Sequence, residues 1–112
     1  SHLKGIPANQ VFVPAVVWFE LEYGVLRSTR PELRRRGMES VQRAYQILNF
    51  DAASAKSAAR IKHALDAAGT PIGNSDLLIA ATALASDLTL VTRNRREFER
   101  VPGLRVENWY DN

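Results

Sequence analysis

The sequence predicts an α/β fold with a mostly parallel sheet. Short β-branched runs alternate with longer segments whose apolar residues recur at helical spacing, and this alternation is typical of parallel strands joined by helices. The chain has 112 residues, 46% of them hydrophobic and 24% charged, which suits one soluble domain with a single core. We therefore expect residues 1–112 to form one domain.

A strand and a helix are expected near the N-terminus. Residues 11–13 form a short apolar run after a turn-like segment, which predicts a buried strand that Pro14 ends. Residues 15–28 predict a helix that follows the strand directly. The apolar residues of this helix recur every four positions, at Val17, Leu21 and Val25.

Two further helices are expected in the middle of the chain. Pro31 suits the first turn of a helix, because that position needs no backbone N–H, and this helix should run to about residue 46. Residues 47–50 indicate a brief extended segment. The alanine-rich residues 52–68 predict the next helix, with Asp51 as its N-cap and the glycine that follows it as its stop.

The C-terminal part alternates in the same way. Residues 74–76 are polar types that suit a helix N-terminus, and the apolar run at residues 77–85 predicts a buried helix. Residues 88–91 predict a strand, residues 93–98 a loop with a short helical turn, and residues 104–107 a last strand. Strands that alternate with helices favour parallel pairing.

The charge pattern favours a partner that carries phosphates. The net charge is +3 and the isoelectric point is about 9.7, and the positive charge is concentrated in two groups. The first group comprises Arg30, Arg34, Arg35 and Arg36, and the second comprises Arg93, Arg95, Arg96 and Arg100. A solvated helix face explains either group equally well, so basicity by itself identifies no nucleic-acid site.

Other compositional features exclude several classes of protein. The chain has no cysteine, which excludes a disulfide framework and a thiolate zinc site and fits a reducing cytoplasm. No apolar run approaches the roughly 20 residues that a bilayer crossing needs, so we expect no membrane association.

Three polar residues lie where ligands gather in open α/β sheets, near the carboxyl ends of strands. Glu20 lies in the helix after the first strand, Asp76 in the first turn of the buried helix, and Asn94 just after the strand that ends at Thr92. Carboxylate and carboxamide oxygens are the ligands that Mg²⁺ and Mn²⁺ prefer. Taken singly, each residue also has an ordinary role, as a surface glutamate, a first-turn aspartate and a turn-forming asparagine.

Four segments carry a family resemblance. Residues 19–24, 70–81, 90–98 and 101–109 resemble, in the same order, the successive signatures of VapC-type PIN-domain toxins. The resemblance covers essentially the whole chain. It implies an α/β fold of the PIN type, a three-layer sandwich with a mostly parallel sheet.

The resemblance also implies roles for individual residues. Glu20 and Asp76 fall at positions of metal-site acids, Asn94 falls where the family carries Asp or Asn, and the hydroxyl of Thr92 would support the site. Proteins of this type are Mg²⁺-dependent endoribonucleases, dimeric and inhibited by a cognate antitoxin. We therefore expect Mg²⁺ or Mn²⁺ as cofactor, and RNA, an antitoxin and a second copy of the chain as partners.

The arginines beside Asn94 suit the substrate that this resemblance implies. Arg93, Arg95 and Arg96 can grip RNA phosphates, a sequence-independent contribution that weakens with salt. Carboxylates nearby would hold one or two divalent ions, which orient and activate a water for in-line attack on the phosphate.

One departure from the family pattern affects the expected activity. The family opens with an apolar strand that ends in Asp-Thr-Asn and supplies the first acid of the site, and nothing in residues 1–10 matches it. The sequence therefore predicts an N-terminally truncated PIN domain. We expect the polypeptide of residues 1–112 to be weakly active or inactive by itself unless the missing segment is supplied in trans.

Two other classes of function stay open. In the first, the chain is a non-catalytic module whose helices at residues 30–46 and 56–65 bind an antitoxin or a second copy. In the second, the basic helix at residues 31–46 binds DNA, although no helix-turn-helix pattern supports it.

Overall fold

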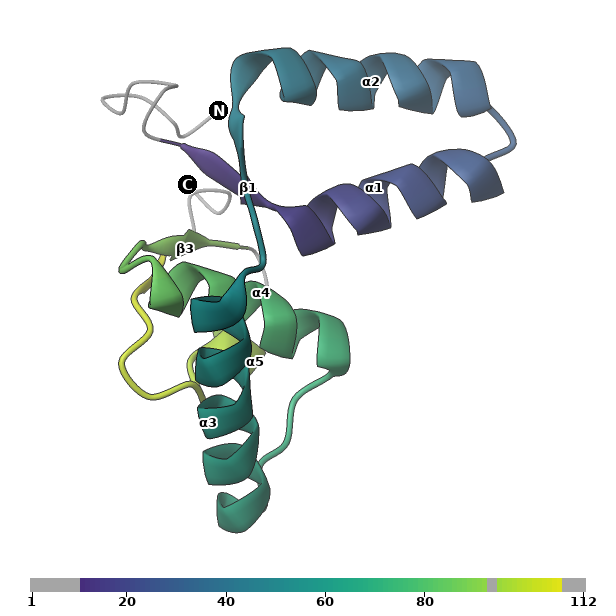
Figure 1. The fold of residues 1–112 in the computed structure, drawn as a ribbon. Coiled ribbons are helices and arrows are strands. Elements are labelled where there is room, and N and C mark those ends of the chain that lie inside the picture. The colour runs from purple at the N-terminus through teal and green to yellow at the C-terminus, as the bar shows by residue number, and fades with distance from the viewer. Residues whose placement is uncertain (1–10, 93–94, 108–112) are drawn as a thin grey trace. The chain divides into compact units, whose positions relative to one another are not determined.

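A computed structural model describes residues 11–92 and 95–107. Within these residues helices and short strands alternate along the chain, as Figure 1 shows. The described residues divide into two compact units, residues 11–49 and the described residues from 50 to 107. Both strand pairs in the described residues are parallel, which confirms the predicted α/β class with parallel pairing.

The first unit is a helical hairpin joined to a pair of strands. It comprises β1 (Phe12–Pro14), α1 (Ala15–Arg27), α2 (Pro31–Ala44) and β2 (Gln46–Leu48). Strands β1 and β2 pair in parallel, with Val13 opposite Ile47. Pro14 is the last residue of β1 and directly precedes α1, so the predicted strand–helix junction is confirmed.

The second helix is shorter than predicted. It ends at Ala44, and Tyr45 adopts an extended backbone conformation. Gln46, predicted to be the last helical residue, instead pairs with Phe12 in the sheet. The prediction was wrong at this end because helical periodicity is a local pattern and gives no information about a strand partner more than thirty residues earlier in the chain.

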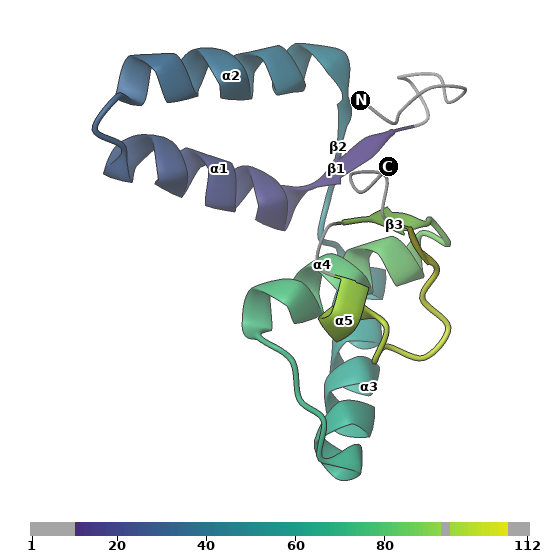
Figure 2. The same ribbon diagram turned by 180° about the vertical axis from the view of Figure 1, so that it is seen from behind.

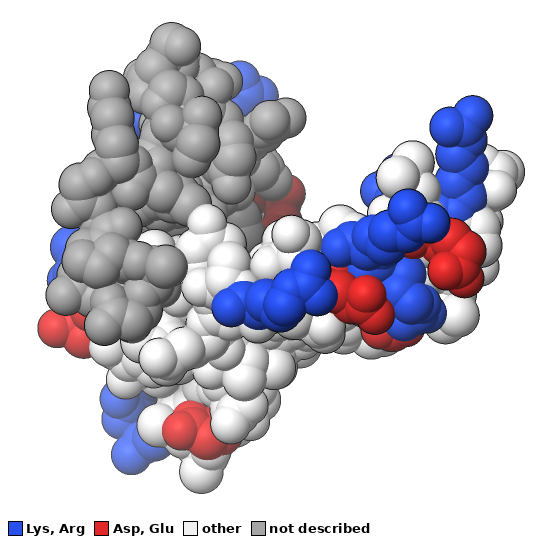
Figure 3. Space-filling view, turned by 90° about the horizontal axis from the view of Figure 1, so that it is seen from above, with Lys and Arg blue, Asp and Glu red and all other residues white. Residues whose placement is uncertain are grey.

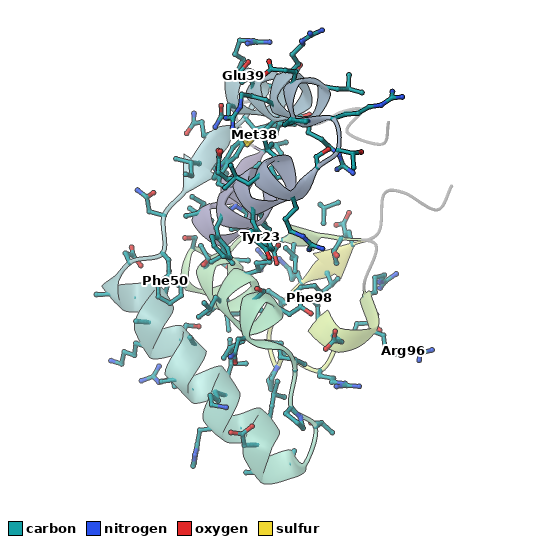
Figure 4. All side chains as sticks on the ribbon, turned by 90° about the vertical axis from the view of Figure 1, so that its right-hand side faces the viewer. Tyr23, Met38, Glu39, Phe50, Arg96 and Phe98 are labelled. Carbon is teal, nitrogen blue, oxygen red and sulfur yellow. The ribbon has the colours of Figure 1, made fainter. Side chains whose placement is uncertain are left out.

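A small core holds the two helices of the hairpin together. Val25 of α1 and Met38 of α2 are 2% and 6% exposed, and Met38 lies between the two helices in Figure 4. Arg35 of α2 also forms an ion pair with Glu22 of α1, with 3.2 Å between Nη2 and Oε1. The charged pair lies at the surface, so apolar contact supplies most of the stabilisation of the hairpin.

The second unit is built on two packed helices. It comprises α3 (Ala52–Ala68), α4 (Asn74–Ala85), β3 (Leu90–Val91), α5 (Arg95–Phe98) and β4 (Val106–Glu107). Its core is formed by residues of these elements and of the loop after α5, among them Ile61, Leu65, Ile79, Ala80, Ala81, Phe98 and Val101. The predicted buried helix at residues 77–85 is thereby confirmed.

One polar residue lies in this core without loss of hydrogen bonding. Thr82 of α4 is 0% exposed, and its hydroxyl donates to the carbonyl oxygen of Leu78 at 2.7 Å. A buried hydroxyl without an acceptor would cost free energy. This bond within the helix explains why a threonine fits inside an otherwise apolar helix.

Both ends of α3 are capped as the sequence predicts. The Asp51 carboxylate accepts hydrogen bonds from the backbone N–H of Ser54 at 2.9 Å and from the Ser54 hydroxyl at 3.0 Å. These bonds hold the pKa of Asp51 below its ordinary value, and the bond from the Ser54 backbone has the larger effect. At the other end Gly69 has φ of 73°, a left-handed conformation that glycine adopts without strain.

The strands of the second unit are shorter than predicted. Strand β3 covers Leu90–Val91 and pairs in parallel with β4, with Leu90 opposite Val106. The predicted strands at residues 88–91 and 104–107 therefore exist, but only the last two residues of each pair with the other strand. In the described ranges no helix is both long and apolar enough to cross a bilayer.

Candidate functional site

Glu20 lies on an open part of α1. Its side chain is exposed, and among the described residues no hydrogen bond or ion pair is found for it. Gly24 lies four residues later, one turn along the same helix, and an added Cβ there would meet no atom within 4 Å. Among the described residues, α1 is therefore open at Gly24, one turn from Glu20.

Asp76 lies in the first turn of α4, which follows the N-cap residue Gly73. Asp76 is half-buried. A negative charge at this position interacts favourably with the helix dipole. The predicted ordinary role of Asp76 and its predicted metal role are compatible.

Thr92 lies at the carboxyl end of β3, where its backbone N–H donates to the carbonyl oxygen of Glu107 at 3.0 Å. The chain reverses between α4 and β3 at Asp87, whose φ is 55°. Helix and strand therefore run in opposite directions, as Figures 1 and 2 show. The first turn of α4, with Asp76, and the carboxyl end of β3, with Thr92, both belong to the second unit.

The predicted phosphate-binding arginines differ in their surroundings. Arg95 of α5 forms an ion pair with Glu99, with 3.1 Å between Nη2 and Oε2. Arg96 is exposed and extends away from the ribbon in Figure 4, and it has no ion-pair partner in the described part of the chain. Arg93 and Asn94, also predicted site residues, lie outside the described residues.

The donor chemistry of these residues fits a hard divalent ion. Glu20 and Asp76 offer carboxylate oxygens, the ligands that Mg²⁺ and Mn²⁺ prefer, and neither is fully buried. Glu20 belongs to the first unit and Asp76 to the second, so their convergence stays a prediction. In residues 11–92 and 95–107 no group of three or more His, Asp or Glu side chains is placed to hold a metal.

A surface feature of α1 was not anticipated from the sequence. The rings of Phe19 and Tyr23 lie with centroids 6.5 Å apart and planes 7° from parallel. The Arg27 guanidinium carbon lies 5.3 Å from the centroid of the Tyr23 ring. The spacing of four residues between these three positions is visible in the sequence, but their exposure is not.

Comparisons with known proteins identify relatives over nearly the whole chain. The family model of the PIN domain matches residues 2–104. Ribonuclease VapC2 of Rickettsia felis is 37% identical over 101 residues, which are 90% of this chain and 75% of the relative. The tRNA(fMet)-specific endonuclease VapC of Shigella flexneri is 39% identical over 101 residues, 90% of this chain and 76% of the relative.

A solved structure agrees with these sequence relationships. The crystal structure of VapBC2 from Rickettsia felis, bound to a DNA fragment from their promoter, superposes with a TM-score of 0.86 at 37% identity, covering 90% of this chain and 76% of the other. The family match and the relatives confirm the resemblance that the sequence motifs indicated. The chain belongs to the PIN-domain family, and its relatives within that family are VapC ribonucleases.

Proposed function

We propose that this chain is the endoribonuclease toxin of a toxin–antitoxin module and hydrolyses RNA phosphodiesters with Mg²⁺ or Mn²⁺. The observation that carries the proposal is the 37–39% identity to VapC ribonucleases over 90% of the chain. Asp76 in the first turn of α4 and Thr92 directly after β3 support it, because ligands in open α/β sheets gather near the carboxyl ends of strands.

The proposed site divides its tasks among side chains of different chemistry. Glu20 and Asp76 act as carboxylate ligands, the Asn94 side chain adds a carboxamide oxygen, and the Thr92 hydroxyl orients one of these groups by hydrogen bonding. A divalent ion, when bound, supplies Lewis acidity and lowers the pKa of a coordinated water.

The arginines of α5 and the loop before it hold the substrate in this proposal. Arg96, which has no ion-pair partner among the described residues, can contact a phosphate directly, whereas Arg95 must exchange its ion pair with Glu99 for one with RNA. Such contacts to phosphate carry no sequence information. The arginines therefore determine affinity, and selection among RNAs depends on other surfaces.

The proposed partners follow from the relatives. We propose that the chain binds a cognate antitoxin, since the Rickettsia felis neighbour is a VapBC complex, and that it forms a homodimer. The tRNA in the name of the Shigella flexneri relative makes initiator tRNA the first RNA to test.

The test is cleavage of initiator tRNA by the purified protein with Mg²⁺, with EDTA, and after Asp76→Asn. This variant keeps the size of the side chain and removes its charge, so we expect a rate at least roughly a hundredfold lower, equivalent to about 2.7 kcal/mol in the barrier. The matched control is Asp66→Asn, which neutralises an exposed aspartate that pairs with Lys62 on α3. Parental cleavage by Asp76→Asn, or in EDTA, would contradict the proposal.

The same assay tests the expected weakness of the polypeptide of residues 1–112. We expect it to cleave slowly by itself, and to gain activity when a peptide carrying the family's Asp-Thr-Asn strand is added. Fast metal-dependent cleavage by the isolated polypeptide would overturn this expectation. Binding of RNA or antitoxin without any cleavage, even with that peptide, would favour the non-catalytic module instead.

A further inference from the structure

One helix face carries two exposed aromatic rings and a cation in a row. We call Phe19, Tyr23 and Arg27 the aromatic stripe. Phe19 and Tyr23 are 65% and 53% exposed, their ring planes are within 7° of parallel, and Arg27 lies against the Tyr23 ring at 5.3 Å. Rings of this size usually bury most of their surface, so a neighbouring pair left exposed indicates a contact surface.

The stripe lies next to the proposed catalytic acid of the same helix. Glu20 follows Phe19 in the chain and lies three residues, less than one helical turn, before Tyr23. Residues three apart on a helix are surface neighbours. A group bound on the Phe19 and Tyr23 rings would therefore lie beside the Glu20 carboxylate.

The described residues of the first unit carry more arginines than glutamates, so the net charge of this unit is positive. Arg30, Arg34 and Arg36 are exposed and have no ion-pair partner among the described residues, while Arg35 bridges the two helices through Glu22. Figure 3 shows basic side chains, which are all arginines in residues 11–49, over the hairpin with acidic side chains among them. This positive net charge favours a ligand that carries phosphates over a basic peptide.

We propose that the aromatic stripe is a stacking platform for unpaired RNA bases beside the cleavage site. The proposal rests on the ribonuclease function proposed above. Unpaired bases stack on aromatic rings and on arginine guanidinium planes, and the stripe offers both in a row. Because a duplex hides its base faces, the stripe selects single-stranded loops over paired RNA.

A protein partner is the competing occupant of the same face. Leu26 and Leu33 are also exposed, at 72% and 59%, and an apolar protein surface would use them as much as the rings. RNA bases would use the flat rings and gain little from a leucine. This difference between ring and leucine separates the two occupants experimentally.

The experiment measures binding of a labelled, unstructured RNA and of a duplex of the same length by fluorescence anisotropy. The protein carries Asp76→Asn and the buffer contains EDTA, so that cleavage does not interfere. Phe19→Ala and Tyr23→Ala should each weaken binding of the single strand roughly tenfold or more, and duplex binding far less. Tyr23→Phe, which keeps the ring, and Leu26→Ala, which removes an equally exposed apolar group, should bind as the parent does.

Each outcome decides between the alternatives. The stacking proposal is overturned if Leu26→Ala weakens binding of the single-stranded RNA as much as the ring variants do. It is also overturned if Phe19→Ala and Tyr23→Ala keep their helicity and bind RNA as the parent does. Either result would favour a protein partner on this face. Different results would contradict the ribonuclease proposal, namely RNA cleavage without metal or full cleavage activity of Asp76→Asn while the aromatic stripe is intact.

Discussion

Arg105 binds Asp87 through two hydrogen bonds, one to the side chain and one to the backbone. Its Nη1 donates to Asp87 Oδ1 at 2.9 Å and its Nη2 to the Asp87 carbonyl oxygen at 2.7 Å, while Nε donates to the Thr89 hydroxyl at 3.2 Å. Asp87 has the left-handed φ of 55° that reverses the chain between α4 and β3. The guanidinium thus holds the turn that connects α4, which carries Asp76, to β3, which directly precedes Thr92.

Replacing the guanidinium should loosen this turn. Arg105→Lys keeps the charge but not the planar fork, and it should lower the free energy of unfolding by about 1 kcal/mol, since the pair is solvent-exposed. Urea denaturation measures the difference. Arg43→Lys, at an arginine with no ion pair in the described chain, is the matched control and should change the midpoint very little.

Asp87→Gly tests the backbone at the same turn. The variant loses the ion pair but removes the strain of a left-handed non-glycine residue, roughly 1 kcal/mol, so we expect almost no net change in stability. A loss as large as that of a core substitution would show that the side chain contributes more than the ion pair with Arg105.

The N-cap of α3 predicts a pH dependence. The folded-state pKa of Asp51 lies below its ordinary value of 3.8 because Ser54 hydrogen-bonds the carboxylate. A lowered pKa contributes stability that is fully present above the unfolded-state value and is lost as pH falls through the folded-state value. Asp51→Ala should therefore lower the melting temperature at neutral pH, and the difference from the parent should shrink below about pH 4.

Asp51→Asn is the control for this cap. Asparagine caps helices about as well as aspartate but does not titrate, so the variant should stay near the parent at neutral pH and lose the acid-dependent component. Identical melting temperatures for Asp51→Ala and the parent at neutral pH would rule out a stabilising cap.

The contact between α3 and α4 should dominate the stability of the second unit. Leu65 is 4% exposed, and truncating a leucine this deeply buried leaves a cavity, so Leu65→Ala should cost about 3 kcal/mol. Leu33→Ala removes the same atoms from a position that is 59% exposed and should cost less than about 0.5 kcal/mol. Guanidinium denaturation of both variants measures the contrast, and similar costs would contradict the assigned core.

Two helical glycines give a matched pair of probes. Added Cβ atoms at Gly24 of α1 and Gly37 of α2 meet nothing within 4 Å, so Gly24→Ala and Gly37→Ala should each stabilise the protein by about 0.5–1 kcal/mol. Only Gly24 lies one turn from Glu20. If substrate approaches the helix there, Gly24→Ala should lower RNA cleavage while Gly37→Ala leaves it unchanged, which parallel melting and cleavage assays show.

The salt dependence of RNA binding tests the arginines of α5. Arg96→Ala should weaken binding similarly for all RNA sequences and reduce the slope of log affinity against log salt by about 0.7–1, the value for one phosphate contact. Arg95→Ala should have a smaller effect, because Arg95 already pairs with Glu99. Equal slopes for parent and Arg96→Ala would exclude Arg96 from phosphate contact.

Much of the fold was predictable because its signals are local. The capping of α3 by Asp51 and its stop at Gly69 depend on side-chain and backbone chemistry within one helical turn, and the burial of α4 follows from its nearly unbroken apolar composition. The end of α2 was mispredicted because Gln46 pairs with Phe12. The candidate acids were predictable by type and motif, since Glu20 and Asp76 are recognised by the residues around them.

The sequence by itself determined the alternation of strands and helices, the family, and the candidate residues Glu20, Asp76, Thr92 and Asn94, because spacing, caps and motifs are properties of neighbouring residues. Tertiary structure alone decided which strands pair, that the Arg105–Asp87 contact holds the turn after α4, and that within residues 11–92 and 95–107 Arg95 has an ion-pair partner and Arg96 has none. It also decided that Phe19 and Tyr23 are exposed. Pairing and exposure depend on segments far apart in the chain, and no local pattern of residues encodes them.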